Sequence, residues 1–268
     1  EEGMRIAGAR SDIWDTSFIL QALHEADPKA SGHDEVGRNA SRWLRAAQMR
    51  ADIPHGARHH RAPARGGWGF ADERHPWPVS DCTAEALEAL LHRGELSEER
   101  TVEAIDFILL RQNDDGGFGS YESRRGPMVL REFNPAEIYG NCMLEYSYTE
   151  CTASCLKALA LAQAKLGDAL NGERGRRVAS ACGRARDFLQ TGQGRDGAWQ
   201  GFWAINHCYG TYFAVSALRA SGVSALSESM VKAGDWLLAH QREDGGWGET
   251  HQALVEERYV EYPPGEPS

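Results

Sequence analysis

The stretch Pro78–Leu91, PVSDCTAEALEALL, places one acidic side chain, Asp81, at the start of a run with strong helix-forming character. Ser80 or Asp81 can cap the exposed amides of the first helical turn. Apolar side chains then recur at helical spacing and predict a buried face; they are Ala84, Leu87, Leu90 and Leu91. Asp81, Glu85 and Glu88 share the opposite face. Taken alone, this pattern is typical of a capped amphipathic helix whose acids face water.

The same register recurs along the chain in segments that each read Thr-x5-Ala-Leu. These segments are Trp14–Leu23, Asp81–Leu90, Glu150–Leu159 and Tyr209–Leu218. Their threonines lie roughly 60 to 70 residues apart, which leaves room for a second helix and a loop in every unit. The chain is therefore predicted to be a stack of helix pairs.

A second repeat lies between the members of the first. In each copy an aromatic-containing helix is followed by Gln and then by a turn rich in Gly and an aromatic residue. The copies are Arg42–Gln48 with Gly66–Phe70, Asp106–Gln112 with Asp114–Gly119, Asp187–Gln193 with Asp196–Trp199, and Asp235–Gln241 with Asp244–Gly248. Gly allows the positive torsions of a tight turn, the aromatic ring can cover the helix end, and the Gln amide can reach backbone groups that the helix leaves unpaired. Together the two repeats predict an all-α fold, an α/α barrel of inner and outer helices.

Composition limits the possible partners and compartments. The chain has 268 residues, of which 41% are hydrophobic, and we treat residues 1–268 as a single domain. A formal net charge of -10 argues against a nucleic-acid surface, because phosphate binding needs clustered Lys and Arg. The sequence has no apolar run long enough to span a bilayer. The six cysteines lie mostly in apolar helical runs without a CxxC pair, which favours reduced thiols and gives no support for a metal site.

The segments VSDCTAE (Val79–Glu85) and PAEIYGNCMLEYSYTECTASC (Pro135–Cys155), together with the turn repeats, resemble the oxidosqualene cyclases. The likeness runs from Trp14 to about Tyr259. A squalene–hopene cyclase would be expected to show Asp-Asp-Thr-Ala where this chain reads Asp-Cys-Thr-Ala, and this difference favours an epoxide as substrate. The resemblance implies a triterpene cyclase of sterol biosynthesis. Such an isomerase protonates the epoxide of 2,3-oxidosqualene and directs its polycyclisation to a sterol-type alcohol, without a cofactor or metal.

The resemblance also implies roles for individual residues. Asp81 would be the acid, Cys82 and Cys151 would hydrogen-bond its carboxyl group, and Glu85 would help to restore its proton through water. Opening an epoxide needs a protonated carboxyl, so burial must raise the pKa of Asp81. The helix N-terminus acts in the opposite direction because its partial positive charge favours the carboxylate.

A migrating positive charge can be stabilised by aromatic faces, which do not capture it as nucleophiles. By resemblance, the aromatic lining of the substrate site would be Trp14, Phe70, Tyr121 and Trp203, although residue type alone fits ordinary core aromatics equally well. His75 resembles the cycloartenol synthases at its position and Val79 the lanosterol synthases, so the product stays open.

Other functions remain open at this point. The chain could be a non-catalytic lipid-binding or interaction module, a squalene–hopene cyclase-like enzyme that acts on squalene, or a barrel like a prenyltransferase β-subunit, which would need zinc ligands. A full-length oxidosqualene cyclase has a second barrel domain and further helices. We therefore expect residues 1–268 alone to form an incomplete, inactive barrel prone to self-association. By resemblance alone, the whole protein would sit as a monotopic protein on the cytoplasmic side of a membrane and take its hydrophobic substrate from the bilayer.

Overall fold

A computed structural model describes residues 10–27, 35–72, 77–124, 126–133, 144–170, 172–203 and 205–263. The longer helices are α1 (Asp12–Ala26), α2 (Glu35–Ala47), α3 (Ser80–Arg93), α4 (Glu98–Leu109), α5 (Thr149–Leu166), α6 (Glu173–Thr191), α7 (His207–Ala220) and α8 (Glu228–Ala239). Shorter elements are α9 (Gln252–Glu256) and the 3-10 helices η1 (Gly56–His59), η2 (Met128–Phe133) and η4 (Gly167–Leu170). Within these residues, β-pairing is limited to isolated bridges, so the predicted all-α class is confirmed.

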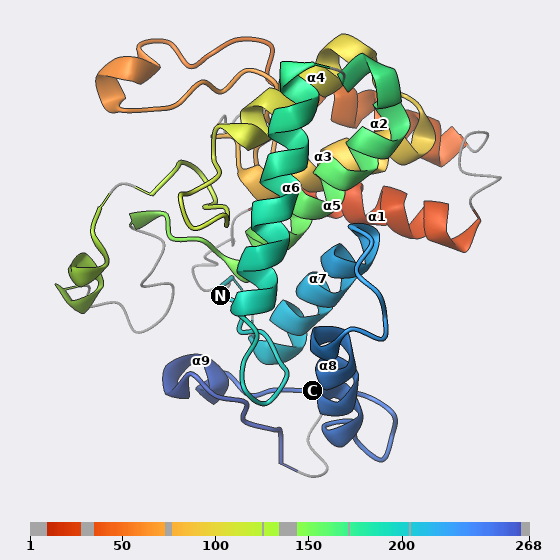
Figure 1. Ribbon diagram of the computed structural model, residues 1–268. Helices are drawn as coiled ribbons and strands as arrows, with labels where there is room; N and C mark the ends of the chain where they lie inside the picture. Colours follow the sequence, from red (N-terminus) through yellow and green to blue (C-terminus); the bar gives the residue numbers. More distant parts are fainter. Residues whose placement is uncertain are drawn as a thin grey trace, which may run out of the picture.

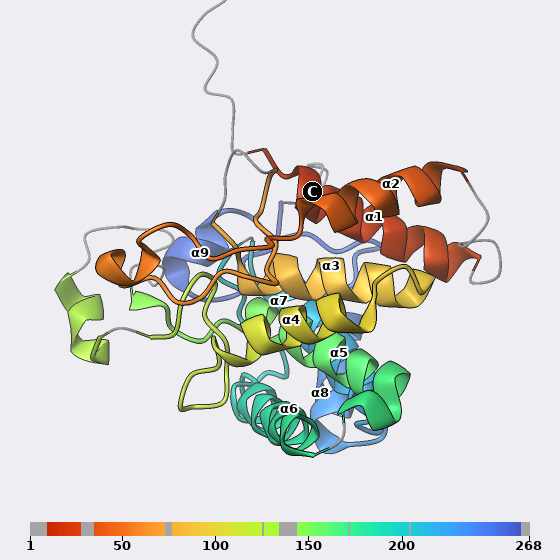
Figure 2. The same ribbon diagram turned by 90° about the horizontal axis from the view of Figure 1, so that it is seen from above.

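The long helices form inner and outer layers (Figure 1). The inner helices α1, α3, α5 and α7 pack against one another in chain order, and α2, α4, α6 and α8 each pack against the inner helix that precedes them. Figure 2 shows the pairs stacked, with α1 and α2 above α3 and α4, and α5 and α6 below. The described residues therefore form the predicted arc of inner–outer pairs, which is part of an α/α barrel.

The central inner helix α3 is buried on every side. Each of its residues except His92 is buried, because α1 and α5 flank it and α4 lies behind it. Its acidic face is no exception, since Asp81 is 7%, Glu85 1% and Glu88 4% exposed. The amphipathic pattern with acids facing water is thus the wrong interpretation for this helix.

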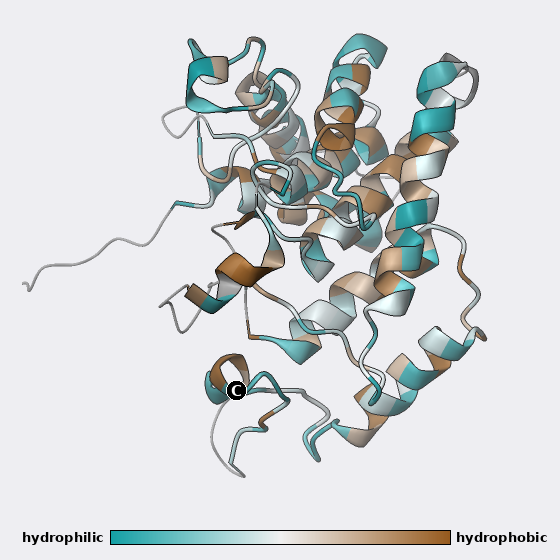
Figure 3. Ribbon diagram, turned by 60° about the vertical axis from the view of Figure 1, so that its left-hand side comes forward, coloured by the Kyte–Doolittle hydropathy of each residue, from teal (hydrophilic) through white to brown (hydrophobic). Residues whose placement is uncertain are grey.

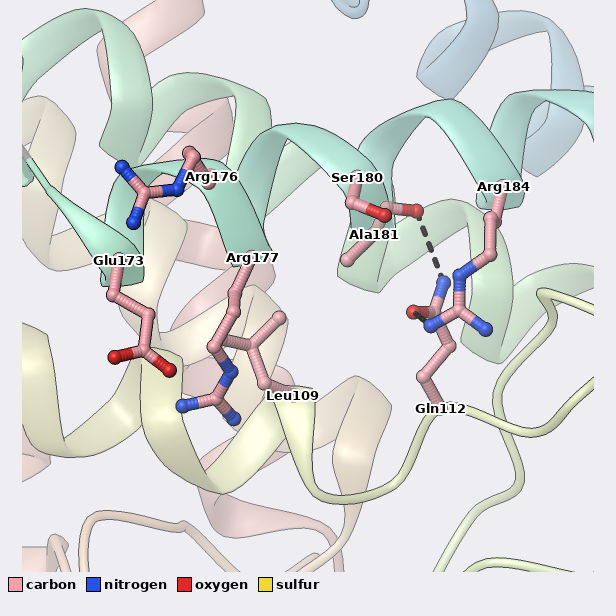
Figure 4. A pocket seen from close by; sticks show the side chains of 8 residues that line it. All are labelled: Leu109, Gln112, Glu173, Arg176, Arg177, Ser180, Ala181 and Arg184. Carbon is pink, nitrogen blue, oxygen red and sulfur yellow. Dashed lines mark hydrogen bonds between the residues drawn. The ribbon is translucent and has the colours of Figure 1, made fainter.

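The repeated Gln residues tie the turns to the outer layer. Gln48, Gln112 and Gln193 each donate a side-chain amide hydrogen to the carbonyl of a turn glycine, at 2.8–2.9 Å. Each also donates to a carbonyl of the next outer helix, as Gln112 does to Ala181 of α6 at 2.9 Å (Figure 4). The expected bond to the Gln's own helix end is therefore replaced by a link between neighbouring repeats. The hollow drawn in Figure 4 is an open surface crevice along α6, lined by Arg176, Arg177 and Arg184 among others.

Three of the repeated threonines join a turn to an inner helix. The hydroxyl oxygens of Thr83, Thr152 and Thr211 accept the backbone N–H of the turn aromatic at 2.9–3.0 Å. The turn tryptophans extend over the outer helix: the indole of Trp68 donates to the carbonyl of Leu44 at 2.7 Å, in the last turn of α2. The indole, rather than the Gln amide to which the sequence pattern gave this role, thus satisfies a carbonyl at the helix end.

Candidate active site

Two glycine turns fix the start of α3, one that precedes it and one that follows α4. The backbone N–H of Val79 donates to the carbonyl of Trp68 at 2.8 Å, and that of Ser80 donates to the carbonyl of Ser120 at 2.7 Å. The Ser80 hydroxyl donates to the carbonyl of Gly119 at 2.6 Å. Val79 is the N-cap residue and makes no side-chain cap bond, so neither Ser80 nor Asp81 occupies the N-cap position. The Asp81 carboxyl still accepts one exposed amide of the first turn, that of Cys82, as the sequence predicted.

Asp81 is buried, and both oxygens of its carboxyl group accept hydrogen bonds. Oδ1 accepts the backbone N–H of Cys82 at 2.7 Å, and Oδ2 accepts the thiol of Cys151 at 3.4 Å. Burial raises the pKa of Asp81 above its ordinary value, and these hydrogen bonds offset only part of the increase. Burial also raises the pKa of both thiols, so Cys82 and Cys151 keep their hydrogens. The site can therefore hold a neutral carboxylic acid whose conjugate base has donors already in place.

Asp81 faces a cavity of about 480 Å³, which is within the usual size range of small-molecule sites. The lining combines side chains from three inner helices and the intervening turns: Trp14, Phe70, Val79, Asp81, Cys82, Ser120, Tyr121, Trp203 and Tyr209. The structure thus brings together every described residue that the sequence assigned to substrate binding. The ring centroids of Trp14 and Phe70 lie 6.2 Å apart. Such a lining presents aromatic faces and one acid to an apolar ligand. His75, also assigned to this site, lies outside the described residues.

Glu85 lies one turn beyond Asp81, among groups from α1 and α5. Its Oε2 accepts the amide of Gln21 at 2.6 Å, and Lys157 lies 3.4 Å from the other Gln21 amide atom, Oε1. Lys157 also pairs with Glu88 at 2.9 Å. Burial, reinforced by the nearby Glu88 carboxyl, raises the pKa of Glu85 to about 7. Glu85 is not among the residues that line the cavity. It is therefore placed to act on Asp81 rather than to contact a ligand.

The structure adds residues that the sequence reasoning missed. Ser120 and Tyr209 line the cavity, and Glu150 is buried behind it, where its Oε1 accepts the backbone N–H groups of Phe202 at 2.8 Å and Trp203 at 2.6 Å. The repeats contained a signal for all three. Tyr209 and Glu150 stand two residues before a repeat threonine, as Asp81 does, and Ser120 follows its glycine turn at the position of Phe70.

Two further properties bear on how a ligand could be held. In the part of the chain that the structure describes, no three His, Cys, Asp or Glu side chains cluster so that they could hold a metal ion. No helix in that same part is long and apolar enough to cross a membrane.

The inner–outer helix stack and the acid-bearing aromatic cavity define a helical-barrel protein that can present one proton to an apolar ligand. Residues 10–268 match the family model for the squalene-hopene cyclase C-terminal domain. The chain belongs to this family.

Curated relatives agree with the resemblance seen in the sequence. The chain is 37% identical to cycloartenol synthase of Dictyostelium discoideum, over 97% of this chain and 38% of that protein. It is 33% identical to human lanosterol synthase, over 97% of this chain and 37% of that protein. The chain therefore spans less than two fifths of the length of these relatives, and the resemblance to oxidosqualene cyclases is confirmed.

Solved structures show the same fold. The type II terpene cyclase MstE from Scytonema superposes with a TM-score of 0.58 at 20% identity, covering 94% of this chain and 61% of that one. The ent-copalyl diphosphate synthase from Streptomyces platensis gives a TM-score of 0.59 at 23% identity, covering 95% of this chain and 40% of that one. The predicted barrel architecture is confirmed by these neighbours.

Proposed function

We propose that the protein containing this chain is a triterpene cyclase that protonates the epoxide of 2,3-oxidosqualene and directs its cyclisation to a sterol-type alcohol. One observation carries the proposal: a buried Asp81 with a raised pKa opens into a cavity lined by aromatic rings. Relatives named cycloartenol and lanosterol synthase support the choice of substrate.

In the first step, Asp81 gives its carboxyl proton to the epoxide oxygen while the carbon–oxygen bond breaks and leaves a tertiary cation. Burial raises the pKa of Asp81 and so favours the neutral carboxyl, the form that carries the proton. The carboxylate that forms is stabilised at once by the N–H of Cys82 and the thiol of Cys151. Neither donor has to move during the reaction, so the cost of reorganisation is small.

In the following steps, the double bonds of the folded chain attack the cation in turn, and positive charge moves along the new rings. Trp14, Phe70, Tyr121 and Trp203 face the cavity and stabilise this charge through their ring faces. Loss of a proton from the last cation completes an isomerisation without net redox change. Asp81 must then regain a proton, and Glu85, with a pKa of about 7, is suited to hold one near it.

The test supplies 2,3-oxidosqualene and, separately, squalene to the complete gene product and analyses the extracted lipids. We expect tetracyclic alcohol from the epoxide and no product from the Asp81→Asn variant. Equal product from wild type and this variant would end the assignment of the acid. Turnover of squalene alone would instead indicate a squalene–hopene-type enzyme. Binding of either lipid without product would indicate a non-catalytic lipid-binding protein.

We also propose that the whole protein binds peripherally to a membrane. The exposed apolar side chains of η2 support this proposal, with Val129 59% and Phe133 77% exposed on a segment that stands away from the helix stack (Figures 1 and 3). Burying such side chains in lipid would be favourable. We expect the protein to sediment with vesicles, and Phe133→Asp to release it without a loss of folding. Wild-type protein that stays fully soluble without detergent would contradict the proposal.

A further inference from the structure

Ser120 occupies a point where the acid, its thiol partner and an aromatic wall of the cavity meet. The residue is 1% exposed. Its backbone N–H donates to a carboxyl oxygen of Glu145 at 2.8 Å, and its carbonyl accepts the N–H of Ser80 at 2.7 Å. Ser80 directly precedes Asp81, so the main chain of Ser120 is anchored to the start of the acid's own helix.

The hydroxyl of Ser120 has two partners, and their chemistry sets its direction. Nε1 of Trp203 lies 2.9 Å from Oγ, and Sγ of Cys151 lies 3.4 Å from it. An indole nitrogen can only donate, so Oγ accepts from Trp203 and its own hydrogen is left for the sulfur. The Cys151 thiol in turn donates to Oδ2 of Asp81 at 3.4 Å. The three bonds therefore run one way, from the indole through the hydroxyl and the thiol to the carboxyl.

We propose that Ser120 is a positioning residue that acts on Asp81 through Cys151 and at the same time holds the Trp203 indole in the cavity wall. The proposal rests on the cyclase function proposed above. In a chain of aligned hydrogen bonds, each donor is strengthened by the bond that it accepts. The thiol that receives the Ser120 hydrogen is thus a better donor to the carboxylate formed when Asp81 gives up its proton. The Ser120 hydroxyl thus affects both the acid strength of Asp81 and the position of the Trp203 ring, which faces the positive charge that protonation creates.

The hydroxyl has little part in holding the backbone. The anchoring contacts to Glu145 and Ser80 are made by main-chain atoms, which an alanine would keep. Ser120→Ala should therefore fold normally while it breaks the chain of bonds. Ser120→Thr keeps a hydroxyl at the same place and serves as the conservative replacement. Ser41→Ala, a buried serine of the outer helix α2, is the matched control.

The kinetic test uses the complete gene product and 2,3-oxidosqualene. We expect Ser120→Ala to lower kcat about tenfold with a smaller change in KM, the size of one hydrogen bond felt in the transition state. Ser120→Thr should recover most of the activity, and Ser41→Ala should match wild type. In a Cys151→Ala background the effect of Ser120→Ala should shrink several-fold, because the path to Asp81 is already broken. Wild-type kcat in Ser120→Ala, or effects of the two changes that simply multiply, would overturn the proposal.

A spectroscopic test separates this proposal from the proposed function because it needs no substrate. The infrared S–H stretch of Cys151 can be assigned by its absence in Cys151→Ala. Loss of the Ser120 hydroxyl should move this band to higher frequency, since the thiol becomes a weaker donor, and Ser120→Thr should restore its position. An unmoved band would refute the link from Ser120 to Cys151 even in an active cyclase. A moved band in a protein that does not turn over oxidosqualene would leave the link standing and refute only the function.

Discussion

Replacing Glu85 by Gln should stabilise the protein at high pH and leave its stability nearly unchanged at low pH. Glu85 is 1% exposed, and burial, followed by repulsion from Glu88, raises its pKa from 4.5 to about 7. The folded state therefore binds more protons than the unfolded state between these two pH values. Stability falls as pH rises through this window and then stays level.

The size of the effect follows from the pKa change. A pKa change of one corresponds to about 1.4 kcal/mol. The rise in the pKa of Glu85 from 4.5 to about 7 therefore means that holding its carboxylate in the interior costs about 3 kcal/mol above pH 7. Near pH 5 the cost is under about 1 kcal/mol, because the carboxyl is largely protonated in the folded state. A Gln side chain has the same shape and can still accept the amide hydrogen that Gln21 donates. Glu85→Gln should therefore gain up to about 3 kcal/mol at about pH 8.

Denaturant unfolding of the complete gene product at about pH 5 and about pH 8 measures this difference directly. The exposed Glu243→Gln is the matched control and should change stability at neither pH. We also expect Glu85→Gln to lower steady-state turnover, since the group that holds a proton near Asp81 is gone. A loss of stability at the higher pH would refute the reasoning. It would mean that the contacts of the ionised carboxylate, directly with Gln21 and through space with Lys157, outweigh its desolvation.

Three further substitutions test the repeat contacts by thermal unfolding of the same protein. Gly116→Ala should cost more than about 2 kcal/mol, because φ is +92° and an added Cβ would lie 2.5 Å from the carbonyl oxygen of Arg184. Gly245→Ala has a similar torsion but open space, so it should cost about 1 kcal/mol, and an equal loss at both sites would contradict the steric argument. Thr152→Val should cost about 1–3 kcal/mol, because the buried N–H of Phe118 loses its acceptor. No measurable change would show that water replaces the hydroxyl.

The layered fold could be predicted from the sequence because the repeats make the same contacts with the same residue types. Thr83, Thr152 and Thr211 all accept a turn N–H, so one residue pattern corresponds to one geometry in three of the four units. The partner of each Gln could not be predicted in the same way. Its second acceptor belongs to the next outer helix, as with Gln112 and Ala181, which lie far apart in the chain. Sequence spacing describes a helix and its own turn but not the neighbour that packs against it.

The burial of the acidic face of α3 could not be predicted from the local sequence pattern, for the same reason. Asp81, Glu85 and Glu88 have the spacing of a solvated face, and only the packing of α1 and α5 against α3 excludes water from them. Lys157 of α5, which pairs with Glu88, makes this burial tolerable. A charged face on a helix therefore has to be judged together with charges on the helices beside it. In this chain that information was spread over widely separated segments.

The candidate site follows from the repeats once their differences are considered along with their similarities. Trp14, Asp81, Glu150 and Tyr209 each stand two residues before a repeat threonine, so the barrel places them at equivalent points of four inner helices. Packing alone would accept similar side chains at equivalent points, yet these four are an indole, two carboxyls and a phenol. Three of them line the cavity, and the fourth, Glu150, holds the backbone of Trp203 against it. A repeat position that keeps its geometry but varies its chemistry is therefore a marker of the functional site, and it points to Asp81 without reference to any relative.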